Sequence, residues 1–295
     1  NVPIVLMLIL LIFYLWYAFR QARANDKLIA QLEADPELAK THHRKFHPWH
    51  PSWDKTVSVW PHLLKREFLA AIIVTAFLIV WSVFLNAPLE DPANPTLTMN
   101  PSKAPWYFLG LQEILVYFDP WFAGVVLPGI IIVGLMIIPY IDINPKGNGY
   151  YCLKDRWFAI SNFLFGFIGL WISTVIIGTF IRGPGWYLFL PGEYWDVHKT
   201  VAITNEDWPS IFGITDFYPA MAFGAVSTLA FLLVPPIIFW QLRHKTSPVL
   251  QKLGSVRYWI TALLFMMQLG VVFKMVLRLG FNVKYIMVGP MGFNI

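Results

Sequence analysis

Charged residues are scarce in this sequence. They make up 13% of its 295 residues, whereas hydrophobic residues make up 57%. A typical soluble domain carries about 25% charged residues, so much of this protein's surface is expected to face lipid. The sequence therefore predicts an integral membrane protein.

Cysteine is nearly absent. The single residue, Cys152, excludes a disulfide within the chain and any Cys-x-x-Cys-His haem attachment. An ordinary packed thiol is the favoured interpretation of Cys152, and a cofactor link or a reactive group is the alternative.

Long apolar runs are what the sequence does contain. Six of them are long enough to cross the roughly 30 Å of hydrocarbon in a bilayer. They cover residues 2–19, 68–85, 121–141, 157–181, 217–240 and 258 to about 278. The predicted fold class is all-α, a polytopic membrane protein with about six transmembrane helices.

These runs lack acidic residues, and no inverted repeat relates them, which argues against a transporter. They also contain none of the seven histidines, so this chain alone is not expected to ligate a bis-His haem. Four histidines cluster in THHRKFHPWH, residues 41–50. Arg44 and Lys45 would repel a divalent cation there, so a basic loop is favoured over a proton-handling surface or a metal site.

Lysine and arginine are distributed unevenly among the loops. The loops after the first, third and fifth runs hold nine, three and four of them, whereas the loops after the second and fourth hold one and two. Because basic loops stay in the cytoplasm, both termini are predicted to lie on the outer side of a bacterial cytoplasmic membrane. The net charge of +5 then reflects topology and not nucleic-acid binding. Residues 2–19 are expected to be a retained anchor.

A Pro-Trp-Tyr corner precedes the third run, in the sequence KAPWYFLGLQEILVYFDP. A helix from Trp106 to about Tyr117 would place Trp106, Gly110, Glu113 and Tyr117 on one face. Aromatic contact, open space and a proton acceptor suit a planar quinone head group. An interfacial helix with a solvated Glu is the alternative. Proline-rich segments at 86–102 and 182–216 are expected to cover this corner from the outer side.

From Pro61 to about Pro184 the sequence resembles the C-terminal half of cytochrome b, the part that stands alone as subunit IV in split quinol:cytochrome oxidoreductases. The resemblance lies in WPHLLKRE, DPANP and KAPWYF. In that family a Pro-Glu-Trp-Tyr motif lies at the outer quinol-oxidation site. The resemblance thus implies that Trp106 and Tyr107 bind quinol, with Ala104 at the position of the motif Pro and Pro105 at that of its Glu.

The predicted function is a membrane subunit that forms part of the quinol-oxidation site of a cytochrome bc-type complex. Because the motif Glu is absent, Glu113 is the candidate proton acceptor, with Tyr107 or water between it and quinol. Asp119 is the second choice, although an N-cap is its more ordinary role. Pro105 and Gly110 would shape the pocket. The alternative is a structural subunit with a degenerate site.

The resemblance also implies what surrounds the chain. No cofactor is expected on this chain alone, and b-type haems and a 2Fe-2S cluster are expected on partner subunits. Those partners are a haem-bearing subunit like the N-terminal half of cytochrome b, a Rieske iron-sulfur protein and a cytochrome c-type acceptor, in a dimeric complex. The predicted domains are an anchor and cytoplasmic loop at 1–60, the quinol-site domain at 61–184, and further helices at 185–295.

Overall fold

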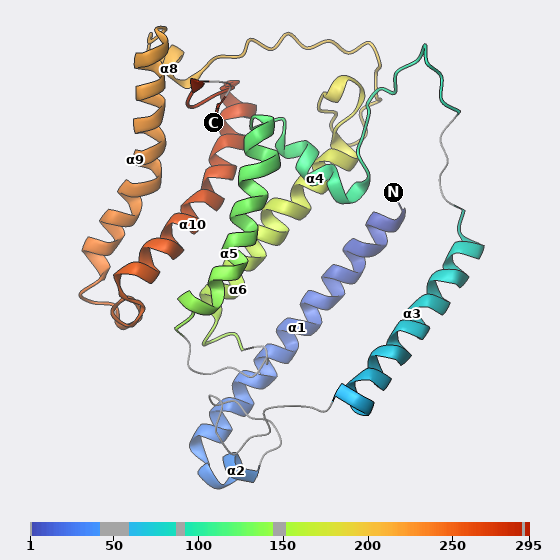
Figure 1. The fold of residues 1–295 in the computed structure, drawn as a ribbon, viewed down its shortest axis with the longest axis vertical. Coiled ribbons are helices and arrows are strands. Elements are labelled where there is room, and N and C mark those ends of the chain that lie inside the picture. The colour runs from blue at the N-terminus through green and yellow to red at the C-terminus, as the bar shows by residue number, and fades with distance from the viewer. Residues whose placement is uncertain (1, 42–58, 87–91, 144–151, 291–292) are drawn as a thin grey trace. The chain divides into compact units, whose positions relative to one another are not determined.

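The computed structural model describes residues 2–41, 59–86, 92–143, 152–290 and 293–295 (Figure 1). Helices joined by irregular segments make up this part of the chain, and its only strand-like pairings are isolated bridges. The prediction of an all-α fold is therefore confirmed. The histidine cluster of residues 41–50 lies almost entirely outside the described residues.

The described helices follow one another along the chain with few long interruptions. They are α1 (Val2–Ala34), α2 (Pro36–Thr41), η1 (Val59–Leu63), α3 (Leu64–Phe84), α4 (Trp106–Ile114), η2 (Phe122–Val126), α5 (Leu127–Ile141), α6 (Trp157–Leu164), η3 (Phe165–Ile172), α7 (Ser173–Ile176), η4 (Ile177–Ile181), η5 (Pro184–Trp186), α8 (Trp208–Ile211), α9 (Phe217–Arg243) and α10 (Pro248–Phe281). Of these, η5 is a 3₁₀ turn, and the other η segments are π-helical turns within or beside longer helices.

Six continuous helical stretches in the described residues are long and apolar enough to cross a membrane. They are Ile4–Ala34, Val59–Phe84, Phe122–Ile141, Trp157–Ile181, Phe217–Arg243 and Pro248–Phe281. The predicted number of spans is therefore confirmed. The second stretch begins earlier than predicted, so it includes His62, which the sequence analysis placed outside the spans.

The first span extends beyond its apolar run. Helix α1 continues to Ala34, so the polar segment after residue 19 prolongs the helix of the first span. Asp26 in this extension accepts a hydrogen bond from the Leu153 backbone N–H at 3.1 Å. The charged half of α1 thereby contacts the segment that leads into α6.

The chain divides into two compact units. One contains Asn1–His43, Asn100–Pro145 and Gly149–Ile295, and the other contains Arg44–Met99 and Lys146–Asn148. Of the described helices, only η1 and α3 belong to the smaller unit. The division at residues 60 and 184 drawn from the sequence stays a prediction.

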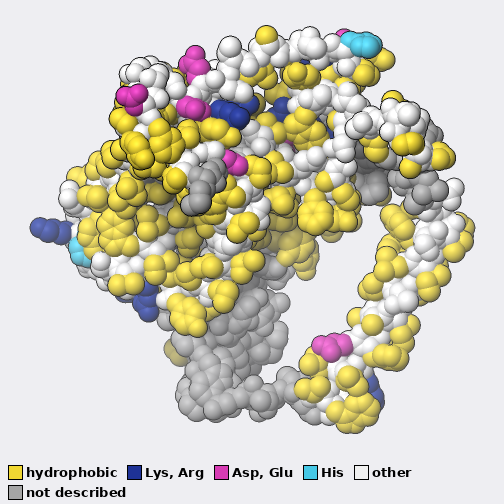
Figure 2. Space-filling view, turned by 45° about the horizontal axis from the view of Figure 1, so that its top comes forward, with side chains coloured by type: hydrophobic (Ala, Val, Ile, Leu, Met, Phe, Trp, Pro, Cys, Tyr) yellow, Lys and Arg dark blue, Asp and Glu magenta, His cyan; other side chains and the backbone are white. Residues whose placement is uncertain are grey.

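Within the larger unit, α10 packs on α9, α5 and η3, while the short helix α4 packs on α7 and η4 (Figure 1). The hydrophobic core lies where α4 ends and the third span begins, and its buried residues are Ile114, Tyr117, Phe118, Ala123 and Val271. Hydrophobic side chains cover most of the helix surface seen in Figure 2, as expected for helices in lipid. Helix α4 is thus held at one end of the spans.

Candidate functional site

Helix α4 begins where the sequence predicts but ends sooner. Pro105 is its N-cap residue with extended backbone, and the Pro105 carbonyl accepts a hydrogen bond from the Phe108 N–H at 2.8 Å. The helix ends at Ile114, after which a tight turn carries the chain through Tyr117. Proline suits this start because its fixed φ and missing N–H cost nothing at a helix N-terminus.

The first turn of α4 presents aromatic side chains outward. Trp106, Tyr107 and Phe108 are 42%, 52% and 53% exposed. Their rings contact one another in sequence, with Trp106 and Tyr107 edge to face at 5.7 Å between centroids and Tyr107 and Phe108 at 4.9 Å. We call these three residues the aromatic surface. Phe108 is a member that the sequence analysis did not single out.

The opposite face of α4 is closely packed. Leu109, Gly110, Glu113 and Ile114 are buried. A methyl group at Gly110 would lie 3.1 Å from Thr174 Oγ1 and 3.1 Å from Val175 Cγ2 of α7. The sequence predicted open space at Gly110. Instead, the absence of a side chain at Gly110 allows the two helices to approach each other.

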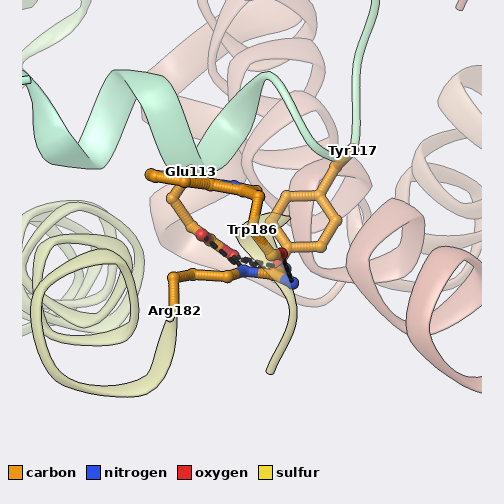
Figure 3. Close-up of polar contacts among 4 residues, drawn as sticks. All are labelled: Glu113, Tyr117, Arg182 and Trp186. Carbon is orange, nitrogen blue, oxygen red and sulfur yellow. Dashed lines mark hydrogen bonds and ion pairs between the residues drawn. The ribbon is translucent and has the colours of Figure 1, made fainter. Parts of the chain in front are cut away.

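Glu113 is fully buried in an ion pair with Arg182, the residue that follows η4 (Figure 3). Arg182 Nε donates to Glu113 Oε2 at 2.9 Å and to Oε1 at 3.2 Å, and Nη2 donates to Oε1 at 2.9 Å. The Tyr117 hydroxyl donates to Oε1 at 2.6 Å. This bidentate geometry is the strongest that a guanidinium and a carboxylate form.

The surroundings favour the charged form of Arg182. Burial opposes the positive charge of Arg182, but hydrogen bonds and charge from Glu113 leave the pKa of Arg182 raised. Burial and the hydrogen bond to Glu113 raise the pKa of Tyr117, so its phenol stays protonated. Burial lowers the pKa of Lys103, against the opposing effect of the Glu113 charge.

The segment before α4 is tied to the same region. Gln112 of α4 accepts a hydrogen bond from the Ala104 N–H at 2.8 Å and donates to the Ser102 carbonyl at 3.0 Å. Lys103 donates to the Thr179 carbonyl at 3.0 Å, and its ammonium lies 4.7 Å from the ring of Trp195. These contacts fix the path of the chain into helix α4, whose first turn carries the aromatic surface.

Asp119 is held by the C-terminal segment. It accepts a hydrogen bond from Asn294 Nδ2 at 2.9 Å, and the neighbouring Trp121 stacks on Phe293 with centroids 3.6 Å apart. Asp119 lies at the predicted N-cap position, directly before the helical residues Pro120 and Trp121, and its carbonyl accepts a hydrogen bond from the Ala123 N–H at 2.9 Å. The side chain of Asp119 also anchors the C-terminal segment.

The structure thus separates residues that the sequence placed in one pocket wall. Trp106 is exposed, whereas Gly110 meets α7 and Glu113 meets Arg182. Tyr117 is buried in the core and donates to Glu113. Arg182 was not predicted as a site residue. Its position directly after an apolar run was the available signal, since an arginine buried at a span end requires an acidic partner.

Metal binding finds no support in the described part of the chain, where His, Cys, Asp and Glu form no group of three or more that could hold an ion. His62 is the one histidine in a described candidate span, so these spans hold no His pair for a haem. Cys152, the single cysteine of the sequence, is half-buried.

Fold and site together define a multispan helical membrane protein with an exposed aromatic surface and a buried ion pair beside one end of its spans. Residues 92–181 match the family of the C-terminal part of cytochrome b, b6 and petD. The predicted resemblance to the C-terminal half of cytochrome b is therefore confirmed over these residues. Its proposed extension back to Pro61 lies outside the match, as does Arg182.

Two curated bacterial proteins are similar to part of this chain. Both are named menaquinol:cytochrome c reductase cytochrome c subunit. The one from Geobacillus thermodenitrificans is 31% identical over 97 residues, which are 31% of this chain and 39% of the relative. The one from Bacillus subtilis (strain 168) is 30% identical over 95 residues, which are 30% of this chain and 36% of the relative. The chain thus spans less than two-fifths of these relatives, and no solved structure matches it.

Proposed function

We propose that this chain is a membrane subunit of a cytochrome bc-type quinol:cytochrome c oxidoreductase and forms one wall of its outer quinol-oxidation site. The observation that carries the proposal is the aromatic surface of Trp106, Tyr107 and Phe108, which lies within the stretch that matches cytochrome b. A quinol head group is planar and apolar with two hydroxyl groups, so it packs on aromatic rings at a membrane boundary.

Oxidation of a quinol to a quinone releases two electrons and two protons. In the proposed complex, one electron passes to the 2Fe-2S cluster of a Rieske-type partner and the other to a b-type haem of a partner like the N-terminal half of cytochrome b. Both of these redox groups are proposed to lie on those partners. The proposed part of this chain is to position the head group through Trp106 and Tyr107 and to receive a proton.

Glu113 is the proposed proton acceptor, and its ion pair with Arg182 sets a condition for proton uptake. Its carboxylate is 0% exposed and has both oxygens bonded to Arg182. Proton uptake by Glu113 therefore requires Arg182 to withdraw first, with Tyr117 as the nearest group able to pass the proton. The matched test is a Glu113→Gln, Arg182→Met double variant, which removes both charges. Quinol oxidation at the normal rate in that variant would exclude Glu113 as the acceptor.

The loop charges support the proposed orientation in the membrane. With the basic loops after spans one, three and five in the cytoplasm, α4 and both termini would lie outside. We propose accordingly that protons are released outside a bacterial cytoplasmic membrane. A cytochrome c-type protein would then accept electrons on that side, within a dimeric complex.

A second candidate is a structural membrane subunit with a degenerate site. Two specific observations favour it. Pro105 replaces the acid of the family motif, and Glu113, the acid in α4, is bound in an ion pair with Arg182. Such a subunit would assemble with the same partners but leave quinol oxidation unaffected by changes in its aromatic surface.

The deciding experiment compares Trp106→Leu with Trp157→Leu in a complex purified through a tag on this chain. Trp157 is a matched control because it is 65% exposed at the beginning of another span. Loss of ring contact worth about 1 to 1.5 kcal/mol should raise the KM for quinol about five- to tenfold in Trp106→Leu alone. Equal KM values in the two variants, with haem b and a Rieske signal present, would favour the structural subunit.

A further inference from the structure

A strained aromatic residue lies directly beyond the ion pair. Trp186 has φ of +62°, and the preceding Gly185 has φ of +66°. Left-handed backbone is easy for glycine but unfavourable for a bulky aromatic residue. Asn282 is the one other non-glycine residue with positive φ in the described chain, and asparagine tolerates that conformation at a helix end. The strain at Trp186 therefore needs a reason.

The turn that carries Trp186 is held from several directions. The Trp186 N–H donates to the Gly183 carbonyl at 3.0 Å, and Arg182 Nη1 donates to the Trp186 carbonyl at 3.1 Å (Figure 3). The Gly185 N–H donates to Asn100 Oδ1 at 2.6 Å. Because Arg182 is itself fixed by Glu113, a continuous set of hydrogen bonds links α4 to this turn.

These contacts bring the turn close to the entry of α4. Asn100 precedes Trp106 by six residues, and Lys103, between them, donates to the Thr179 carbonyl just before the turn. The ring of Trp186 is only half-buried, and no aromatic ring of the described residues packs against it. An aromatic side chain is thus held in a costly conformation, in a turn that is bonded to Asn100 before α4 and to the Arg182 partner of Glu113, without a stacking partner of its own among the described residues.

We propose that Trp186 is a second aromatic contact for the quinol head group and that it determines which head groups bind. This inference rests on the proposed function. In it, Glu113 and Arg182 are positioning residues, since they hold the Trp186 carbonyl and through it the ring. A bicyclic naphthoquinol head group has more area to place on this ring than a monocyclic benzoquinol.

The test removes the Trp186 ring and its left-handed backbone conformation together. Trp186→Gly removes the ring and also relieves the left-handed conformation, so the variant should unfold at the wild-type temperature or above it. Its KM for naphthoquinol should nevertheless rise about tenfold, and more than its KM for benzoquinol, with kcat changed much less. Trp186→Phe should recover part of the affinity. Asn282→Gly is the matched control, because it relieves the same backbone conformation without removing a proposed contact.

Each outcome decides the matter. An unchanged KM in Trp186→Gly, or an equal change in Asn282→Gly, would overturn the role of Trp186 while leaving the proposed function in place. Equal changes for both quinols would overturn its role in selecting head groups. A wild-type complex that assembles with haem b and the Rieske protein but does not oxidise quinol would remove the proposed function, and this inference with it.

Discussion

Removal of the arginine from the buried ion pair is the sharpest test of how this site is built. Arg182→Met keeps much of the side-chain volume but deletes three hydrogen bonds to Glu113 and one to the Trp186 carbonyl. The Glu113 carboxylate is 0% exposed, so it would remain buried with the Tyr117 hydroxyl as its hydrogen-bond donor. Breaking such a pair costs about 3 to 5 kcal/mol, which is roughly two to four powers of ten in the unfolding equilibrium.

The assay is thermal and denaturant unfolding of the purified protein in detergent, followed by circular dichroism. Arg156→Met is the matched control, since the pair of Arg156 with Asp142 is 31% and 30% exposed in its side chains and should contribute about 0 to 1 kcal/mol. The Glu113→Gln, Arg182→Met double variant should recover most of the lost stability, because no uncompensated charge remains. A loss in Arg182→Met no larger than that of the control would refute this reasoning.

Two further changes probe the same contact. Gly110→Ala should destabilise the protein by about 1 to 3 kcal/mol, because the added methyl group meets Thr174 Oγ1 at 3.1 Å, whereas Gly124→Ala, with nothing within 4 Å, should be neutral or slightly stabilising. Thermal unfolding in detergent measures both, and equal effects would contradict the close approach of α4 and α7. Tyr117→Phe should cost about 1.5 to 3 kcal/mol at neutral pH for its lost bond to a carboxylate. Because the folded state raises the pKa of Tyr117, its stabilising effect is complete below pH 10.0, the ordinary pKa, and falls above it, so wild type should lose more stability than Tyr117→Phe between pH 10 and 11.

The spans were predictable from the sequence because bilayer thickness imposes a length and a composition on each of them. The start of α4 was predictable too, since Pro105 marks it locally. Its end was not, because nothing between Ile114 and Tyr117 breaks a helix. The early end comes from packing: Tyr117 and Phe118 turn inward to join the core at the start of the third span.

The partner of Glu113 could not be predicted from local pattern. Arg182 lies 69 residues further along the chain, and only the packing of α4 on α7 and η4 brings the two together. Helical periodicity predicted that Gly110 and Glu113 share a face of α4, but periodicity does not say what that face meets. The face was taken to line a pocket, and it lines a helix contact.

The ion pair changes how variants of Glu113 must be interpreted. Glu113→Gln alone leaves Arg182 buried without its counter-charge and loosens its hold on the Trp186 carbonyl, so quinol oxidation would fall whether or not Glu113 ever carries a proton. Loss of activity in that variant is therefore compatible with an acceptor and with a positioning residue. The double variant separates them, because it removes both charges together. A fall in kcat with unchanged KM then indicates a lost proton acceptor, and a rise in KM with unchanged kcat indicates a displaced Trp186.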